Sequence, residues 1–266
     1  MISDQLSEPI ITEGLATAIL GCRVLYYSTT GSTMDEAKKA ALRNAPEGTL
    51  VVADEQSAGR GRFQRSWVSP QGVNLYLSVI LRPSKDHASQ LGMMASLALA
   101  RALGSIANDR CHVTIKWPND LRIGNKKVAG ILIESSLSEE PARNFSIIGI
   151  GVNVNFDPSD YPEIRDLATS LQSELGHSIP RISLLKAIME EIEELYFLIR
   201  LGGSVQEEWS SFIDTLGQDI SVAIGEEIYE GYAQGVTEDG SLIIRLRDGS
   251  LKVLAAGEVT LRKSEK

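Results

Sequence analysis

Runs of apolar residues in the first 155 positions predict a series of strands with few helices between them. Short runs rich in large and β-branched residues predict strands over 23–27, 49–54, 74–81, 113–116, 127–134 and 145–152. Apolar residues at helical spacing predict helices over 34–43 and about 89–107. Because most strands follow one another without a helical crossover, the pattern favours an α+β fold with a mixed, largely antiparallel sheet.

The second half of the chain changes from helix to short strands. Residues 183–199 place their large apolar side chains on one helical face, and we interpret the glutamates at 190, 191, 193 and 194 as a solvated face. From residue 219, short strands separated by Gly225, Glu238-Asp239-Gly240 and Arg247-Asp248-Gly249 predict a small β-barrel. We therefore expect a large domain over 1–215 and a second domain over 216–266.

The start of the chain is interpreted as an N-terminal extension over 1–21. Apolar residues at helical spacing in 10–20 predict a docking helix. About 20 residues precede the first predicted strand, too few for a three-helix DNA-binding module, so we expect no operator binding.

Composition narrows the classes of partner and compartment. A net charge of -9 disfavours binding to nucleic acid, which demands a surplus of Lys and Arg. The two cysteines, Cys22 and Cys111, lack metal-ligand spacing and argue against a disulfide framework or zinc site. No apolar run reaches the roughly 18 residues of a membrane span, and residues 1–20 lack the pattern of a secretion signal. We expect a cytoplasmic protein that does not bind membranes.

One basic loop stands out in this acidic chain. Residues 56–67, Q-S-A-G-R-G-R-F-Q-R-S-W, combine three arginines with two glycines between two predicted strands. Glycines allow a ligand to approach the backbone closely, and guanidinium groups offer paired donors to carboxylate and phosphate oxygens. The pattern favours an anion-binding loop; the alternative is a solvated hairpin with incidental arginines.

Three further motifs follow the loop: K-W-P-N-D at 116–120, K-K-V-A-G-I-L at 126–132 and G-I-G-V-N-V-N at 149–155. With this order of motifs, the chain from about residue 22 to 262 resembles the biotin protein ligases. The resemblance implies a catalytic core related to class II aminoacyl-tRNA synthetases, followed by a small SH3-like barrel. It implies that biotin is activated with ATP and Mg²⁺ to biotinyl-5'-AMP and transferred to a lysine of a biotin carboxyl carrier protein, by a monomer or a homodimer.

Charge is the chemical obstacle to forming an acyl-adenylate. An ionised carboxylate needs no general base to attack the α-phosphorus of ATP, but bringing it to a triphosphate requires fixed cations and donors around the reacting atoms. The presence of only three histidines therefore does not count against catalysis. No base for the acceptor lysine is evident.

The resemblance assigns roles to individual residues. Lys127 and Arg62 are the expected catalytic residues, and the alternative for Lys127 is a structural ion pair. The expected biotin-binding residues are Ser32, Thr33, Gln56, Gly59, Arg60, Arg62, Lys127, Gly130, Gly149 and Gly151. The expected ATP-binding residues are Arg62, Arg65, Trp67, Lys116, Asn119 and Lys127, and Asn119 and Asp120 are candidate ligands of Mg²⁺.

Several of these residues also have purely structural interpretations. Ser32 or Thr33 is also suited to cap the following helix. The strand glycines are alternatively bulges. Asn119 and Asp120 alternatively form a turn after Pro118, and Trp67 and Trp117 provide stacking surface or core area.

Two positions depart from the family pattern. Met34 stands where the family commonly has asparagine, and Gln64 stands where glycine is frequent. The first departure puts one polar ligand contact in doubt, and the second is expected to stiffen the loop. We expect the carrier protein to dock at edge strands, around 72–81 or 145–152. The competing functions are a lipoate protein ligase, a non-catalytic biotin-binding regulator and, from the fold alone, a tRNA synthetase.

Overall fold

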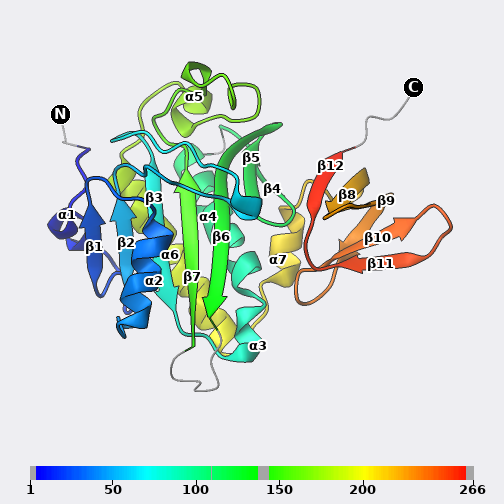
Figure 1. Ribbon diagram of the computed structural model, residues 1–266, viewed down its shortest axis with the longest axis horizontal. Coiled ribbons are helices and arrows are strands. Elements are labelled where there is room, and N and C mark those ends of the chain that lie inside the picture. The colour runs from blue at the N-terminus through cyan, green and yellow to red at the C-terminus, as the bar shows by residue number, and fades with distance from the viewer. Residues whose placement is uncertain (1–3, 109, 137–143, 262–266) are drawn as a thin grey trace.

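The computed structural model describes residues 4–108, 110–136 and 144–261, and these residues form two β-sheets with flanking helices (Figure 1). The larger sheet has seven strands in the order β1-β2-β3-β7-β6-β5-β4. β1 and β2 run parallel, and the other neighbours run antiparallel. The predicted α+β class with a mixed, mostly antiparallel sheet is confirmed. The strands are β1 (Val24–Tyr27), β2 (Leu50–Ala53), β3 (Leu75–Leu81), β4 (Val113–Lys116), β5 (Asp120–Ile123), β6 (Lys126–Ser136) and β7 (Phe145–Val152).

The two faces of this sheet are covered differently. α4 (Leu91–Ala107) and α6 (Arg181–Arg200) pack together behind it and bury the main hydrophobic core (Figure 1). α2 (Thr33–Leu42) covers part of the opposite face, where Met34, Ala37 and Ala41 contact a smaller apolar cluster. α2 does not cover the part of this face formed by Gly130 of β6 and Gly151 of β7, which lines a cavity. Shorter helices are α1 (Glu8–Thr12), α3 (Lys85–Ala88), α5 (Leu171–Leu175) and α7 (Gln206–Ser211), with single 3₁₀ turns at η1 (Arg62–Gln64) and η3 (Pro158–Asp160).

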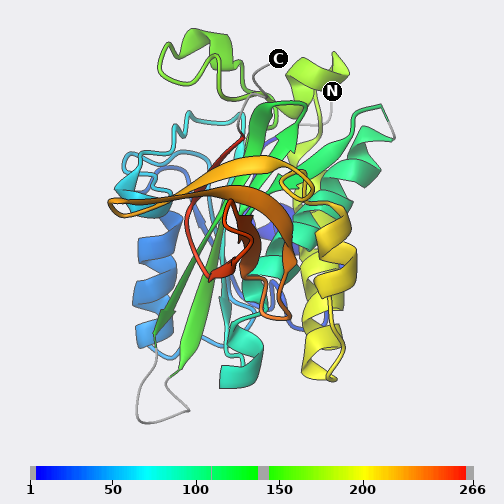
Figure 2. The same ribbon diagram turned by 90° about the vertical axis from the view of Figure 1, so that its right-hand side faces the viewer.

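The second sheet is entirely antiparallel, in the order β11-β10-β9-β8-β12. Its strands are β8 (Asp219–Ile224), β9 (Glu227–Val236), β10 (Leu242–Leu246), β11 (Leu251–Leu254) and β12 (Glu258–Leu261). It lies beside the β4–β5 end of the first sheet (Figures 1 and 2). The turn between β9 and β10 fixes it there, because Trp117 Nε1 donates to the carbonyl oxygen of Gly240 at 2.9 Å. In the described residues, no helix has the length and apolar character needed to cross a bilayer.

The predicted helix over 10–20 is wrong beyond Thr12. Gly14 turns the chain with φ +67°, and the backbone N–H groups of Ala18, Ile19 and Leu20 donate to the carboxylate of Glu193. A buried carboxylate that accepts several amide bonds outweighs the weak helical preference of this segment. The same contact corrects the interpretation of the α6 glutamates as solvated, since Glu193 is buried.

The predicted docking edges are also wrong. β3 and β7 are neighbours in the middle of the seven-stranded sheet, and its edges are β1 and β4. Strands 72–81 and 145–152 therefore have no free edge to offer a carrier protein. β5 was missed, because its four residues follow Asn119 directly and are too few to show a period.

Candidate active site

Three glycines leave bare backbone on the open face of β6 and β7. Gly149 and Gly151 are two residues apart on β7 and so share a face, and Gly130 lies opposite Gly151 on β6. A Cβ atom on Gly149 would lie 2.5 Å from Met34 Sδ, and one on Gly151 would lie 2.6 Å from Trp67 Cε2. Met34 and Trp67 therefore lie directly against the backbone of the sheet. The β6–β7 register is unbroken at these glycines, so they are not bulges in this pairing. A cavity of about 290 Å³ is lined by these three glycines.

One end of the cavity is polar and uncharged. Gln56 Oε1 accepts hydrogen bonds from Thr33 N at 2.9 Å and Thr33 Oγ1 at 3.2 Å. Ser78 Oγ donates to Thr33 Oγ1 at 2.9 Å. Ser32 is the N-cap residue of α2 and lines the cavity, but its hydroxyl makes no capping bond. The capping interpretation is therefore wrong for Ser32: its backbone carbonyl oxygen accepts from Asp35 N, and the first N–H of the helix, that of Thr33, donates to Gln56.

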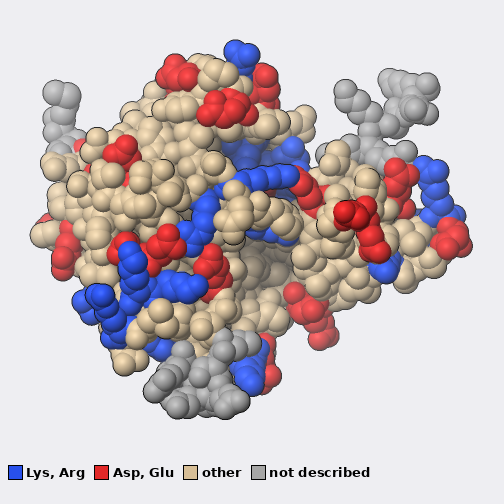
Figure 3. All heavy atoms as spheres, in the orientation of Figure 1, with Lys and Arg blue, Asp and Glu red and all other residues tan. Residues whose placement is uncertain are grey.

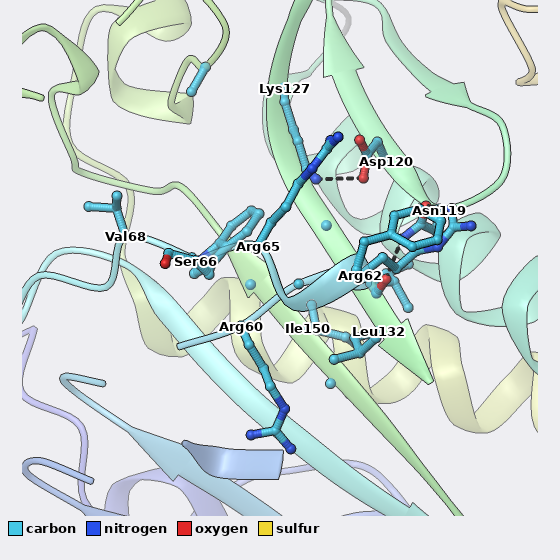
Figure 4. Close-up of a pocket in the computed structure, with 18 of the residues that line it drawn as sticks. Arg60, Arg62, Arg65, Ser66, Val68, Asn119, Asp120, Lys127, Leu132 and Ile150 are labelled. Carbon is cyan, nitrogen blue, oxygen red and sulfur yellow. Dashed lines mark hydrogen bonds and ion pairs between the residues drawn. The ribbon is translucent and has the colours of Figure 1, made fainter. Parts of the chain in front are cut away.

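The basic loop forms a short hairpin across the cavity (Figure 4). Trp67 N donates to Gly59 O at 2.9 Å and Gly61 N donates to Arg65 O at 2.8 Å. Gly59 is required at its position, because a Cβ atom there would lie 2.7 Å from Trp67 O. The tip is strained: Phe63 and Gln64 have φ values of +55° and +58°, in the left-handed region that favours glycine.

Arg60 lines the cavity and is held by two carboxylates. Its guanidinium donates to Asp35 of α2 at 2.8 Å and to Glu134 of β6 at 3.3 Å. The hydrogen bond to Asp35 raises the pKa of Arg60. In Figure 4 its side chain points away from Lys127 and Asp120.

Arg62 and Arg65 connect the loop to the start of β12 in the second sheet. Arg62, which is half-buried, donates to Asn119 Oδ1 at 3.0 Å and to Gly257 O at 3.2 Å. Burial lowers the pKa of Arg62, although a guanidinium remains charged at neutral pH. Arg65 makes a two-point ion pair with Glu258 at 2.5 and 2.6 Å.

A cluster of cations forms the other end of the cavity. Lys127 Nζ lies 2.5 Å from Asp120 Oδ1, so the structural ion pair considered from sequence is present (Figure 4). The ammonium also lies 5.1 Å from the centre of the Trp67 ring. Lys116 lines the same space, and burial, reinforced by the charge of Arg122, lowers its pKa. Figure 3 shows lysine and arginine side chains gathered at the hollow beside the second sheet. Such a surplus of positive charge favours binding of a polyanion.

The candidate Mg²⁺ ligands are occupied by protein contacts. Asn119 Nδ2 donates to Ile131 O at 2.5 Å while its Oδ1 accepts from Arg62. In the part of the chain that the structure describes, no group of three or more His, Cys, Asp or Glu could hold a metal ion. Mg²⁺ is often held by one or two carboxylates together with substrate phosphates. Asp120 fits that limited role, whereas the described residues form no metal cage made of protein ligands alone.

The two tryptophans that belong to the motifs, Trp67 and Trp117, differ in their surroundings. Trp117 is 1% exposed and belongs to the core, as its structural interpretation predicts. Trp67 is half-buried and lines the cavity, and its indole Nε1 is buried without a hydrogen-bond partner in the described part of the chain.

Sequence reasoning missed several residues of the cavity. Ser78 carries no motif and lies behind the polar end, where its hydroxyl donates to Thr33 Oγ1. Leu132 ends the motif at 126–132 and lines the cavity, although no role was expected for it. Gly257 and Glu258 come from the second domain, and no sequence pattern places them beside a loop almost 200 residues earlier.

Comparisons with known proteins agree with this geometry. The chain matches the Biotin/lipoate A/B protein ligase family over residues 26–153 and the Biotin protein ligase C terminal domain over 215–262. It is 36% identical to the bifunctional ligase/repressor BirA of Bacillus subtilis, over 95% of this chain and 78% of the relative. It is 35% identical to the biotin--[acetyl-CoA-carboxylase] ligase of Paracoccus denitrificans, over 85% of this chain and 96% of that relative. A solved structure of the biotin protein ligase from Aquifex aeolicus in complex with biotin and ATP has a TM-score of 0.77 and 30% identity, covering 91% of this chain and 100% of that one.

Proposed function

The chain belongs to the biotin protein ligase family, and from that membership we propose that its cavity joins biotin to ATP and passes biotin to a lysine of a biotin carboxyl carrier protein. The observation that carries the proposal is the polarity of the cavity. An uncharged hydrogen-bonding end at Thr33 and Gln56 is joined by bare backbone to a cationic end at Arg62, Lys116 and Lys127. Biotin has the matching shape, with a ureido ring at one end and a carboxylate at the other.

In the first step, a carboxylate oxygen of biotin bonds to the α-phosphorus of ATP, the bond from that phosphorus to the bridging oxygen breaks, and pyrophosphate leaves. The residues of the cationic end counter the negative charge that accumulates in this step. We place Lys127 between the carboxylate and the α-phosphate, with Arg62 contacting both. A magnesium ion carried on the phosphates would supply further positive charge, and Asp120 would be its protein carboxylate.

Asn119 has a positioning role in this proposal, because it ties Arg62 to the backbone of Ile131. Lys116 and Arg65 would bind the outer phosphates. Trp67 covers Gly151, and its indole N–H has no hydrogen-bond partner among the residues that the structure describes; we propose that it contacts the nucleotide. Gly59 and Arg60 would shape the biotin end, where Ser32 also lies.

In the second step, the deprotonated lysine of the carrier attacks the acyl carbon, and AMP leaves. No side chain in the cavity is assigned as the base, and holding the amine beside the reactive adenylate supplies much of the rate enhancement. We place the division between the domains at 215/216, and we propose that the core is related to class II aminoacyl-tRNA synthetases and that the second sheet is an SH3-like barrel.

The test is biotin-dependent exchange of labelled pyrophosphate into ATP, followed by labelling of an apo carrier domain. Exchange and labelling with biotin, and neither with lipoate, are expected. Exchange with lipoate alone would identify a lipoate ligase instead. Biotin binding without exchange would identify a non-catalytic binder.

A further inference from the structure

Met34 forms an apolar wall inside the polar end of the cavity. It follows Thr33 in the first turn of α2, is 4% exposed, and lines the cavity. Its Sδ atom would lie 2.5 Å from a Cβ on Gly149, so the thioether rests on the bare backbone of β7. The side chain is therefore held between helix and sheet rather than free to turn away.

Strand register places this wall within a gradient of polarity. Ser78 of β3, Gly149 of β7 and Leu132 of β6 are directly paired, and directly paired residues point to the same face. The row begins at the Ser78 hydroxyl, which donates to Thr33, and ends at the apolar side chain of Leu132. Met34 covers Gly149 in the middle of the row. The surface therefore changes from hydrogen-bonding groups at β3 to apolar side chains at β7 and β6.

This inference rests on the proposed function. In the fused rings of biotin, the ureido carbonyl and the ring sulfur lie on opposite sides. A ureido group that bonds to Thr33 and Gln56 directs the sulfur toward the apolar side of the row. We propose that Met34 is a specificity-determining residue that selects the thioether form of biotin over biotin S-oxide.

The physical basis is the lack of a donor at this wall. The sulfoxide oxygen is a strong acceptor, and neither Met34 nor Leu132 has an N–H or O–H side-chain group to offer it. A hydrophobic pocket disfavours an isostere that carries a hydroxyl in place of a methyl group by about 100-fold, and we expect an effect of the same order for the sulfoxide oxygen.

The experiment compares the dissociation constants of biotin and biotin S-oxide, measured by calorimetry on the wild-type protein, Met34→Gln and Met34→Leu. Glutamine has nearly the length of methionine and adds an amide donor, whereas leucine is a donor-free control. The wild type and Met34→Leu should prefer biotin by about 100-fold, and Met34→Gln should reduce this preference by about tenfold or more. A ratio of two ligands on the same sample does not depend on the fraction of folded protein.

Equal affinities of the wild type for the two ligands, or an unchanged ratio in Met34→Gln, would overturn the assignment. If Met34→Gln does not fold, equal affinities of the wild type for the two ligands would still overturn the assignment. Binding ratios are independent of pyrophosphate exchange, so absence of exchange refutes the proposed function without affecting this result.

Discussion

Replacement of Lys127 by methionine removes one ammonium from the cationic end and keeps most of the apolar stem. In the structure this ammonium lies 2.5 Å from Asp120, and the two side chains are 33% and 27% exposed. A pair this accessible contributes no more than about 1 kcal/mol to stability, so the variant is expected to fold.

The effect on adenylation is expected to be much larger. A full charge about 4 Å from another interacts by about 4 kcal/mol at an effective dielectric constant of about 20. Because only part of a charge develops on the α-phosphate oxygens, we expect a loss of about 2–4 kcal/mol, or roughly 30- to 1000-fold in rate. Biotin affinity should fall by less than about tenfold, since Arg62 still faces the carboxylate and an interaction strengthened in the transition state affects rate more than binding.

The assay measures pyrophosphate exchange at saturating biotin together with the dissociation constant of biotin. Lys126→Met is the matched control, because this neighbouring lysine is exposed and donates to Arg165 O outside the cavity. It should leave both quantities unchanged. Equal losses of rate and affinity in Lys127→Met would refute a transition-state role.

Three further changes test other parts of the site. Arg62→Ala should release the adenylate to solvent and raise biotinylation of bystander lysines, and no rise would contradict the proposed contact of Arg62 with the carboxylate and the α-phosphate. Gly151→Ala puts a Cβ atom 2.6 Å from Trp67, so the affinity for ATP should fall by about 5- to 100-fold. Gly104→Ala is the control: its Cβ atom would meet open space in α4, and the affinity for ATP should stay unchanged. Burial lowers the pKa of Lys116 from 10.5, so kcat/KM for ATP should fall with rising pH before an ordinary lysine would lose its proton. Lys116→Arg should remove this fall, because a guanidinium stays charged over this range. A wild-type profile of kcat/KM that is flat up to pH 10.5 would contradict the prediction.

Local patterns in the sequence predicted most of the first sheet. The strands at 113–116 and 145–152 were predicted to the residue, because period and apolar content are properties of neighbouring positions. Failures occurred where distant contacts decided the conformation. Residues 18–20 belong to a segment with helical spacing, yet their backbone N–H groups donate hydrogen bonds to Glu193, about 175 positions later in the chain.

The candidate site divides in the same way. Motif residues such as Gln56, Arg62 and Lys127 line one cavity, as the motifs predicted, because close ligand approach and anion binding demand particular residue types. The sequence by itself determined which chemical groups are available. The tertiary structure alone decided their neighbours: strand register placed Ser78 and Leu132 on either side of Gly149, and packing of the second domain brought Glu258 to the arginine loop. Such pairings depend on how strands align and domains pack, which no local period encodes.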